Sequence, residues 1–360
     1  MSTIESNVTL QAEPPKAKPV AKRARASKKT APNAAASLVA ALKFAKVAQS
    51  KAGTVAQQHC IISGGWLAAS NGVLTVGHKV EEDLQACPHS TNLLEALLKC
   101  GQELSITQLS VNTLAIKSGL FKALIPCASF SELEITAPDT PIAAIDDRVK
   151  AALECVLPLA TEGAQNAALA AVLLQSETAV ATNGAAVLEA WHGISLPPGL
   201  LLPKVAANAI AKAGKPLASF GYSQSSATFY FDDGSFIKTQ LFSERYPHYQ
   251  SFFNGETNAW DLPEGFFTAV HAIESFSRNG VVYFDENAVS SHEHENEAST
   301  YQIEGLPDGM AFNAKLLTLV EHAFKKVEFQ KSRNRAVFFG ENCRGILMAV
   351  EFNKDDDIPF

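Results

Sequence analysis

The chain has 360 residues, of which 47% are hydrophobic and 19% charged, and its net charge is -7. This is the composition of a globular protein with room for two or three domains of roughly 100 to 150 residues each. No run approaches the roughly 18 consecutive apolar residues of a membrane helix, and the first residues lack a signal-peptide apolar core. The six cysteines never approach CxxC spacing, so neither a zinc knuckle nor a disulfide framework is indicated, and a reducing cytoplasm is expected.

Residues 1–35 form a basic arm. They carry seven Lys and Arg against two Glu, a net charge of +5. Since the whole chain has a net charge of -7, the remainder has -7 - 5 = -12. The arm is rich in Ala, Pro and Lys and has no hydrophobic period, so it is predicted to be disordered. Two interpretations stay open: a non-specific phosphate-binding arm and a solubilising tail.

Beyond the arm, six helices are predicted at a regular spacing. Their expected starts, at residues 37, 90, 146, 203, 263 and 313, lie 50 to 60 residues apart. Each start is marked by a capping or helix-opening residue and is followed by apolar residues at helical spacing. The marking residues are Asn33 or Ser37, Ser90, Asp146, Pro203, Pro263 and Asn313.

Between the helices lie runs that alternate in polarity and contain turn residues, as β-hairpins do. The runs cover 64–76, 105–124, 171–190, 218–242, 281–303 and 327–352. A layer of helices over antiparallel strands, repeated six times, predicts an α+β fold. Two repeats make one domain, so three helix-plus-antiparallel-sheet domains are expected, at 36–139, 140–253 and 254–352.

Three stretches resemble the bacterial DNA polymerase III beta subunit, the sliding clamp. They are Val180-Ala181-Thr182-Asn183-Gly184 with Val187; Leu202-Pro203-Lys204 with the later run from Lys238 to Tyr249; and Phe312-Asn313-Ala314-Lys315-Leu316-Leu317 with the strand from Gly345 to Val350. Their order and the threefold period agree with the family over residues 36–352. The resemblance implies the DNA clamp fold and a subunit that dimerises head to tail into a closed ring, with helices lining a hole for duplex DNA.

In such a ring, processivity comes from topology and needs only loose phosphate contacts, because tight base contacts would prevent sliding. The resemblance also implies partners: double-stranded DNA, a replicative polymerase and a clamp loader. No cofactor or metal is implied. The candidate DNA-facing cations are Lys43, Lys46, Lys51, Arg148, Lys150, Lys204, Lys212, Lys315, Lys325 and Lys326.

The family receives partner peptides in a hydrophobic cleft between its second and third domains. Carried over by position, the lining is Leu169, Thr182, Gly184, Val187, Pro247, Phe252, Ile346 and Met348. This chain departs from the family pattern at Ala185-Ala186, where His-Arg is usual, and at Met348-Ala349, where Met-Pro is usual, so an altered peptide preference is expected. At the ring-closing interface, Phe121 and Ile273 resemble the apolar pair.

Residues 353–360 are expected to form an acidic recognition tail. Its six residues Asp355, Asp356, Asp357, Ile358, Pro359 and Phe360 resemble the acidic tip of bacterial single-stranded DNA-binding proteins. Carboxylates suit a basic ridge, and an aromatic ring with an α-carboxylate suits one pocket. The tail is therefore predicted to recruit enzymes that recognise such tips. Its combination with a clamp predicts a viral or mobile-element protein that works in a host cytoplasm.

Catalytic chemistry has little support in the sequence. His292-Glu293-His294-Glu295 could supply two metal ligands from one strand face, but no third ligand is visible, so an exposed charged strand or hairpin is expected. No nucleotide-binding, hydrolase or metalloprotease motif is present. A non-enzymatic protein is predicted. Two rivals to the clamp stay open: a single-stranded DNA-binding protein that recruits through its tail, and a decoy that occupies host replication and repair enzymes.

Overall fold

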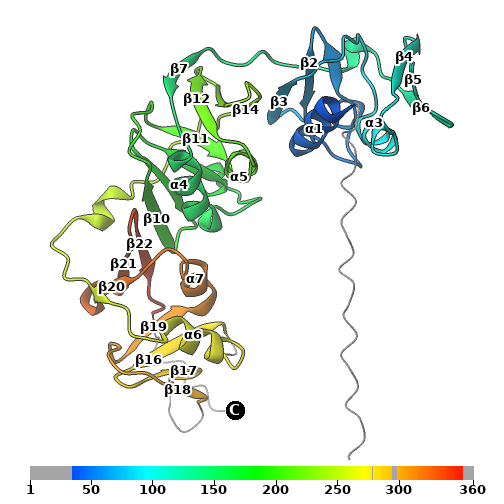
Figure 1. The fold of residues 1–360 in the computed structure, drawn as a ribbon. Coiled ribbons are helices and arrows are strands. Elements are labelled where there is room, and N and C mark those ends of the chain that lie inside the picture. Colours follow the sequence, from blue (N-terminus) through cyan, green and yellow to red (C-terminus); the bar gives the residue numbers. More distant parts are fainter. Residues whose placement is uncertain (1–34, 278, 294–297, 352–360) are drawn as a thin grey trace, which may run out of the picture.

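The computed structural model describes residues 35–277, 279–293 and 298–351. These residues form a crescent in which the sheets lie on the convex side and the helices on the concave side (Figure 1). The predicted basic arm and the acidic tail lie outside the described residues, except for Ala35. No helix among the described residues is long and apolar enough to cross a membrane.

Six units follow one another along the described chain, each with one main helix and then three strands. The first two units contain α1 (Ala36–Ala45), α2 (Val55–Gln58), β1 (Ile61–Ser63), β2 (Trp66–Ser70), β3 (Leu74–Lys79), α3 (Ser90–Leu97), β4 (Ser105–Ser110), β5 (Thr113–Ser118) and β6 (Phe121–Pro126). The next two contain β7 (Pro141–Ala144), α4 (Arg148–Val156), β8 (Ala171–Leu174), β9 (Thr178–Thr182), β10 (Ala186–Trp191), β11 (Leu200–Pro203), α5 (Lys204–Ala211), β12 (Leu217–Tyr222), β13 (Ser226–Phe231) and β14 (Phe236–Gln240). The last two contain β15 (Trp260–Asp261), α6 (Phe266–Glu274), β16 (Val281–Asp285), β17 (Ala288–Ser290), β18 (Thr300–Gln302), β19 (Met310–Asn313), α7 (Ala314–Leu319), β20 (Lys326–Gln330), β21 (Arg335–Phe339) and β22 (Cys343–Met348).

The predicted helices are present, and their first residues differ from the expected ones by three residues or fewer. Asn313 caps α7 as predicted, because its side chain accepts a hydrogen bond from the Leu316 amide. Helix α6 begins at Phe266 rather than at Pro263, because the preceding Gly265 has a left-handed φ of 80°, which a right-handed helix cannot contain. The cap of α3 is His89 rather than Ser90, and that of α1 is Ala35 rather than Asn33 or Ser37.

Strand pairing joins the thirds of the chain. We call the last strand of each unit its seam strand: β3, β6, β10, β14, β18 and β22. At the first junction β3 pairs antiparallel with β14 inside a seven-stranded sheet, and at the second junction β10 pairs with β22 inside an eight-stranded sheet. Both long sheets therefore combine strands from two predicted domains, whose boundaries stay predictions.

The two remaining seam strands have no such partner within the described chain. Strand β6 ends a three-stranded sheet, and β18 ends a four-stranded sheet. They lie at opposite ends of the crescent (Figure 1). Each presents a row of backbone groups that no neighbouring strand satisfies, which is a template for pairing with another chain.

Two hydrophobic clusters hold the sheets. The larger lies between the helices and the sheets along the whole crescent. The smaller lies against the eight-stranded sheet and brings together Val180, Val187, Tyr249, Val337 and Ile346. Because side chains alternate between the faces of a strand, the second cluster uses the sheet face that the helices leave open. The segment after β14 covers this face and forms the surroundings of the main cleft.

Candidate functional site

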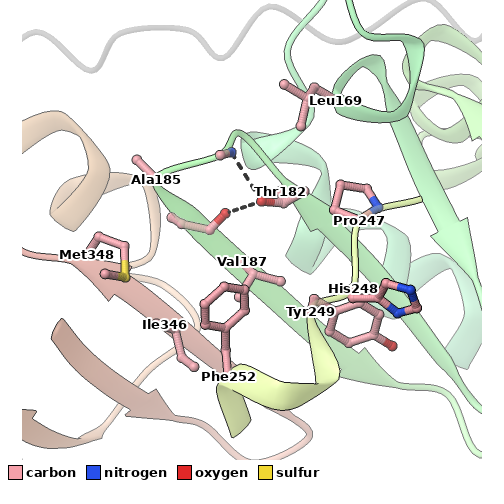
Figure 2. Close-up of a pocket in the computed structure, with 12 residues that line it drawn as sticks. Leu169, Thr182, Ala185, Val187, Pro247, His248, Tyr249, Phe252, Ile346 and Met348 are labelled. Atoms are coloured by element: carbon pink, nitrogen blue, oxygen red, sulfur yellow. Dashed lines mark hydrogen bonds between the residues drawn. The ribbon is translucent and has the colours of Figure 1, made fainter. Parts of the chain in front are cut away.

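A cavity of about 300 Å³ lies where the segment after β14 meets the second junction. It brings together all eight residues that the sequence predicted for the partner cleft, although they come from regions nearly 180 residues apart (Figure 2). We call this cavity the junction cleft. Its full lining is Leu169, Thr182, Gly184, Ala185, Ala186, Val187, Pro247, His248, Tyr249, Phe252, Ile346 and Met348.

The floor of the junction cleft is the seam between β10 and β22. Val187 and Ile346 are register partners across this seam, and both are at most 5% exposed. Met348 lies two residues further along β22, on the same face as Ile346, and is 38% exposed. The floor is thus apolar and buried at its centre and accessible at one end.

One end of the cleft is a tight turn between β9 and β10. The Asn183 side chain accepts hydrogen bonds from the amides of Ala185 at 3.0 Å and Ala186 at 2.8 Å. The Thr182 hydroxyl donates to the Ala186 carbonyl at 2.6 Å and accepts from the Gly184 amide at 3.2 Å. Gly184 has a φ of 92°, a left-handed conformation that favours glycine. These bonds fix the Asn-Gly turn that the sequence predicted.

The opposite wall is the segment from Pro247 to the short helix η5 (Gln250–Phe253). Its anchor is Tyr249, which is 4% exposed. Phe252 is 46% exposed and its ring points over the floor near Val187 and Ile346 (Figure 2). This wall therefore offers an accessible aromatic surface held in place by a buried neighbour.

The junction cleft contains few groups that titrate. Its lining contains one histidine, His248, and one tyrosine, Tyr249, and no Lys, Arg, Asp or Glu. Burial, together with the negative Glu189 nearby, raises the pKa of Tyr249 to about 12, so its hydroxyl stays protonated at neutral pH. The ring of His248 lies 2.9 Å from Arg245 Nη2. A ligand of this cleft is therefore recognised mainly through apolar contacts.

Eight of the ten predicted DNA-facing cations are exposed, namely Lys43, Lys46, Lys51, Arg148, Lys212, Lys315, Lys325 and Lys326. Arg148 forms an ion pair with Asp146 at 2.9 Å. Lys326 lies on strand β20, and not on a helix as expected, with Asp261 at 3.8 Å. Lys325 immediately precedes that strand.

The two remaining predicted cations contact main-chain oxygens; the expectation of a solvated helix charge is wrong for Lys150, whereas Lys204 is half-buried. Lys150 is 9% exposed, and its ammonium donates to the main-chain oxygens of Ala213 and Lys215. Lys204 donates to the Ala160 oxygen at 2.6 Å. The sequence placed both lysines on predicted helices but gave no sign that main-chain oxygens from other segments would accept hydrogen bonds from them.

The predicted pair at the ring-closing interface is separated by the fold. Phe121 starts β6 at one end of the crescent and is partly buried, whereas Ile273 is 3% exposed on the buried face of α6. Ile273 therefore has no surface to offer a second copy, and the prediction is wrong for it. The apolar side chains exposed near the two unpaired seam strands are Leu120, Leu124, Phe276 and Tyr301.

The histidine-rich segment follows β17. His292 and Glu293 are exposed, and His294 and Glu295 lie outside the described residues. Within the described part of the chain, no three His, Cys, Asp or Glu side chains are grouped in a way that could hold a metal ion.

Sequence reasoning did not find the polar group beside the cleft. Glu189 is buried and contacts Tyr249, Thr178 and Arg344. A single carboxylate in the otherwise apolar strand from Ala186 to Trp191 was the available signal, since buried charges are retained only with partners. Its partner Arg344 is 155 residues away, so the sequence could not name it.

The chain matches no protein-family model and no curated protein sequence. Its structure is similar to solved sliding clamps. The DNA polymerase III subunit beta from Pseudomonas aeruginosa has a TM-score of 0.74 and 11% identity over 88% of this chain and 98% of that one. The sliding clamp from Bacillus subtilis has a TM-score of 0.74 and 13% identity over 88% and 97%. The Helicobacter pylori beta clamp bound to DNA ligase peptide has a TM-score of 0.70 and 16% identity over 88% and 98%.

These likenesses define the fold class. The crescent of six helix-plus-sheet units has the DNA clamp fold, and the α+β prediction is confirmed. More particularly, the fold is similar to that of the DNA polymerase III beta subunit, at 11% and 13% sequence identity to the first two of these structures.

Proposed function

We propose that this protein is a sliding clamp-like processivity factor. Two copies close head to tail into a ring around duplex DNA, and the junction cleft tethers the polymerase and other replication proteins. The role is mechanical rather than catalytic. A replicative polymerase and a clamp loader are the expected partners, and a cytoplasmic location is expected for such a factor.

The pairing of the seam strands carries this proposal. Among the described residues β3 pairs with β14 and β10 with β22, which leaves one edge each of β6 and β18 without a neighbouring strand at the two ends of the crescent. The three-stranded sheet of β6 and the four-stranded sheet of β18 together contain seven strands, as many as the internal sheet at the first junction. Pairing β6 of one copy with β18 of another repeats the internal arrangement and closes both edges.

Exposed apolar side chains support an interface at these two ends. Leu124 on β6 is 58% exposed and the adjacent Leu120 is fully exposed. At the other end, Tyr301 on β18 is 37% exposed and Phe276 after α6 is 63% exposed. An interface core is typically apolar and aromatic. In a head-to-tail ring of two copies, the β6 end of one copy meets the β18 end of the other at both interfaces.

The concave face suits duplex DNA. The helices lie on this face (Figure 1), and exposed lysines accompany them: Lys43 on α1, Lys46 just after it, Lys212 after α5 and Lys315 on α7. Lysines that contact phosphates without reading bases allow sliding. The chain beyond residue 35 has a net charge of -12, derived from -7 overall and +5 in the arm, which repels DNA from the outer surface.

The junction cleft suits a short apolar peptide. Its floor is apolar, its accessible wall is aromatic, and the similar Helicobacter pylori clamp is described as bound to a DNA ligase peptide. We propose the same class of ligand here. The presence of Ala185 and Ala186 in the lining leaves the turn without charged side chains, which favours peptides that rely on apolar anchors.

The acidic tail supports an additional recruiting role. Asp355 to Phe360 lie outside the described residues, and their likeness to single-stranded DNA-binding protein tips is the ground for proposing that they bind tip-recognising enzymes. A clamp with this tail would bring such enzymes to the DNA it encircles. This combination is what we expect of a viral or mobile-element protein in a bacterial host.

Retention on circular DNA tests the main proposal. After loading on nicked circular DNA, the protein is expected to stay bound during gel filtration, and to be lost when the same DNA is linearised, because a ring slides off free ends. Equal retention on both forms, with tight binding to short single strands, would contradict the ring and favour the single-stranded DNA-binding alternative.

A further inference from the structure

An ion pair lies across the second junction, beside the cleft but outside its lining. Glu189 on β10 and Arg344 on β22 are register partners. Arg344 Nη2 lies 2.6 Å and Arg344 Nε 2.7 Å from Glu189 Oε2. The Glu189 side chain is 7% exposed and that of Arg344 is 32% exposed. Charge-assisted hydrogen bonds of this length between partly buried side chains are strong and directional.

The second oxygen of Glu189 binds the wall of the cleft. Tyr249 donates its hydroxyl to Glu189 Oε1 at 3.2 Å, and Thr178 on β9 donates to the same oxygen at 3.3 Å. The carboxylate thus joins β9, β10, β22 and the segment after β14. Removing the carboxylate would leave two buried hydroxyls and one guanidinium without their acceptor.

Arg344 also contacts the end of this wall, through the ring of Phe253. Its guanidinium carbon lies 4.0 Å from the ring centroid of Phe253 and 5.1 Å from that of Trp191, distances at which a cation is attracted to an aromatic face. Tyr249 and Phe253 also contact each other edge to face, with ring centroids 6.4 Å apart. Phe252, the accessible aromatic residue of the cleft, lies between these two anchored residues in the sequence.

The pair also sets the floor. Val187 and Ile346 lie two residues from Glu189 and Arg344 along their strands, so both pairs share one face of the seam. Neither Glu189 nor Arg344 lines the cavity. One pair of side chains therefore links the strands of the floor to the aromatic wall from outside the cavity.

We infer that Glu189 and Arg344 are positioning residues that hold the wall from Tyr249 to Phe253 against the β10–β22 seam and so preorganise the cleft for an apolar peptide. This inference rests on the proposed peptide-binding function. A buried ion pair alone contributes little net stability, whereas a preorganised wall raises affinity by removing an ordering cost at the moment of binding.

The test compares Arg344→Met with a matched ion pair elsewhere. Lys238 and Asp139 lie 3.4 Å apart at the first junction, with side chains 14% and 9% exposed, and Asp139 also accepts hydroxyls from Ser226 and Thr228. Lys238→Met therefore breaks a comparable hydrogen-bonded ion pair whose residues do not line the cleft. The probe is a fluorescein-labelled copy of the DNA ligase peptide that the Helicobacter pylori clamp binds.

Arg344→Met is expected to weaken peptide binding about tenfold or more and to speed amide hydrogen exchange across residues 246–254. Lys238→Met is expected to lower thermal stability as much as Arg344→Met does. It is expected to leave peptide affinity and hydrogen exchange across residues 246–254 unchanged. Arg344→Lys keeps the charge and is expected to restore part of the affinity. Glu189→Gln with Arg344→Met is expected to bind no more weakly than Arg344→Met alone, because the two residues act as one unit.

Equal effects of Arg344→Met and Lys238→Met on both readouts would overturn the inference, as would unchanged exchange across residues 246–254 in the Arg344 variants. Should the unaltered protein fail to bind the peptide, the proposed ligand class is contradicted. Hydrogen exchange then still decides whether the pair holds the wall. If Arg344→Met does not fold, Arg344→Lys and Glu189→Gln provide the same comparison with smaller expected changes.

Discussion

The ammonium of Lys150 on α4 donates a hydrogen bond of 3.0 Å to the main-chain oxygen of Ala213, just beyond α5. A second acceptor is the Lys215 oxygen, and Asp147 lies 3.1 Å away. The lysine thus ties α4 to the loop that follows α5 and satisfies two main-chain oxygens of that loop. A residue expected to face DNA instead joins two segments of the central third.

Replacing Lys150 by Ala is expected to lower the free energy of unfolding by about 2 kcal/mol, because two carbonyls lose a buried donor. Lys46→Ala is the control, since Lys46 is exposed; its stability is expected to stay within about 0.5 kcal/mol. Denaturant unfolding measures both. For DNA binding the opposite order is expected. Lys46→Ala should lower the magnitude of the slope of log affinity against log salt concentration by about one, the loss of one phosphate contact, whereas Lys150→Ala should leave this slope unchanged. A larger stability loss in Lys46→Ala would contradict these assignments.

Ring closure is expected to depend on Leu124. A carboxylate placed on an edge strand opposes pairing with another chain, so Leu124→Asp is expected to convert the dimer to a monomer in sedimentation velocity, with an unchanged circular dichroism spectrum. Leu109 lies on β4 at the other edge of the same sheet and is 57% exposed. Leu109→Asp is expected to remain dimeric, and a monomer there would point to a different interface.

Phe252 is expected to contribute affinity rather than stability. Its ring is 46% exposed, so Phe252→Ala removes little buried area and should cost less than about 1 kcal/mol of folding free energy. Loss of an aromatic anchor from a binding cleft is expected to weaken peptide binding about tenfold, measured by fluorescence anisotropy. Phe130→Ala, at a phenylalanine 45% exposed outside the cleft, should leave the affinity unchanged; equal weakening in both variants would argue against the cleft.

The stability of the protein is expected to fall in acid through Asp233. Burial raises the pKa of Asp233, but hydrogen bonds from Lys215 and Ser235 outweigh this and hold the pKa at about 2. Since the unfolded pKa is about 3.9, the stabilisation is present above pH 4 and is lost as the pH falls towards 2. The stability difference between the unaltered protein and Asp233→Asn should therefore shrink over this range. A constant difference would show that the carboxylate charge is not the cause.

Deletion of Phe360 is expected to abolish binding to enzymes that recognise single-stranded DNA-binding protein tips. The aromatic ring and its carboxylate are the expected anchor of such a tail. Pull-down with one tip-recognising enzyme measures this, while sedimentation of the same variant should still give a dimer. Binding that survives the deletion would remove the tail from the proposed function.

Much of the local structure was accessible from the sequence. The Asn183-Gly184 turn, the Asn313 cap and the spacing of the main helices are short-range features, fixed by residues a few positions apart. The cleft lining came from a resemblance in three stretches, and the structure brings those eight residues around one cavity. The function of that cavity stays a proposal.

Long-range relationships were not accessible. Strands β3 and β14 pair across the first junction, yet alternating strands carry no signal that names their partner, and the same pattern would fit a pairing within one domain. Ile273 was assigned to ring closure by its resemblance to the family's apolar pair, and the sequence did not show that this side chain is buried in the core. Lys150 read as a solvated charge because a sequence does not show which main-chain carbonyls come within reach.

The sequence by itself determined the repeated unit, because caps, turns and apolar periods act over a few residues. The tertiary structure alone decided which seam strands remain unpaired, which lysines face solvent, and how Glu189 meets Arg344 across 155 residues. These depend on contacts between distant segments, where hydrogen-bond geometry and burial are set only once the whole crescent has formed.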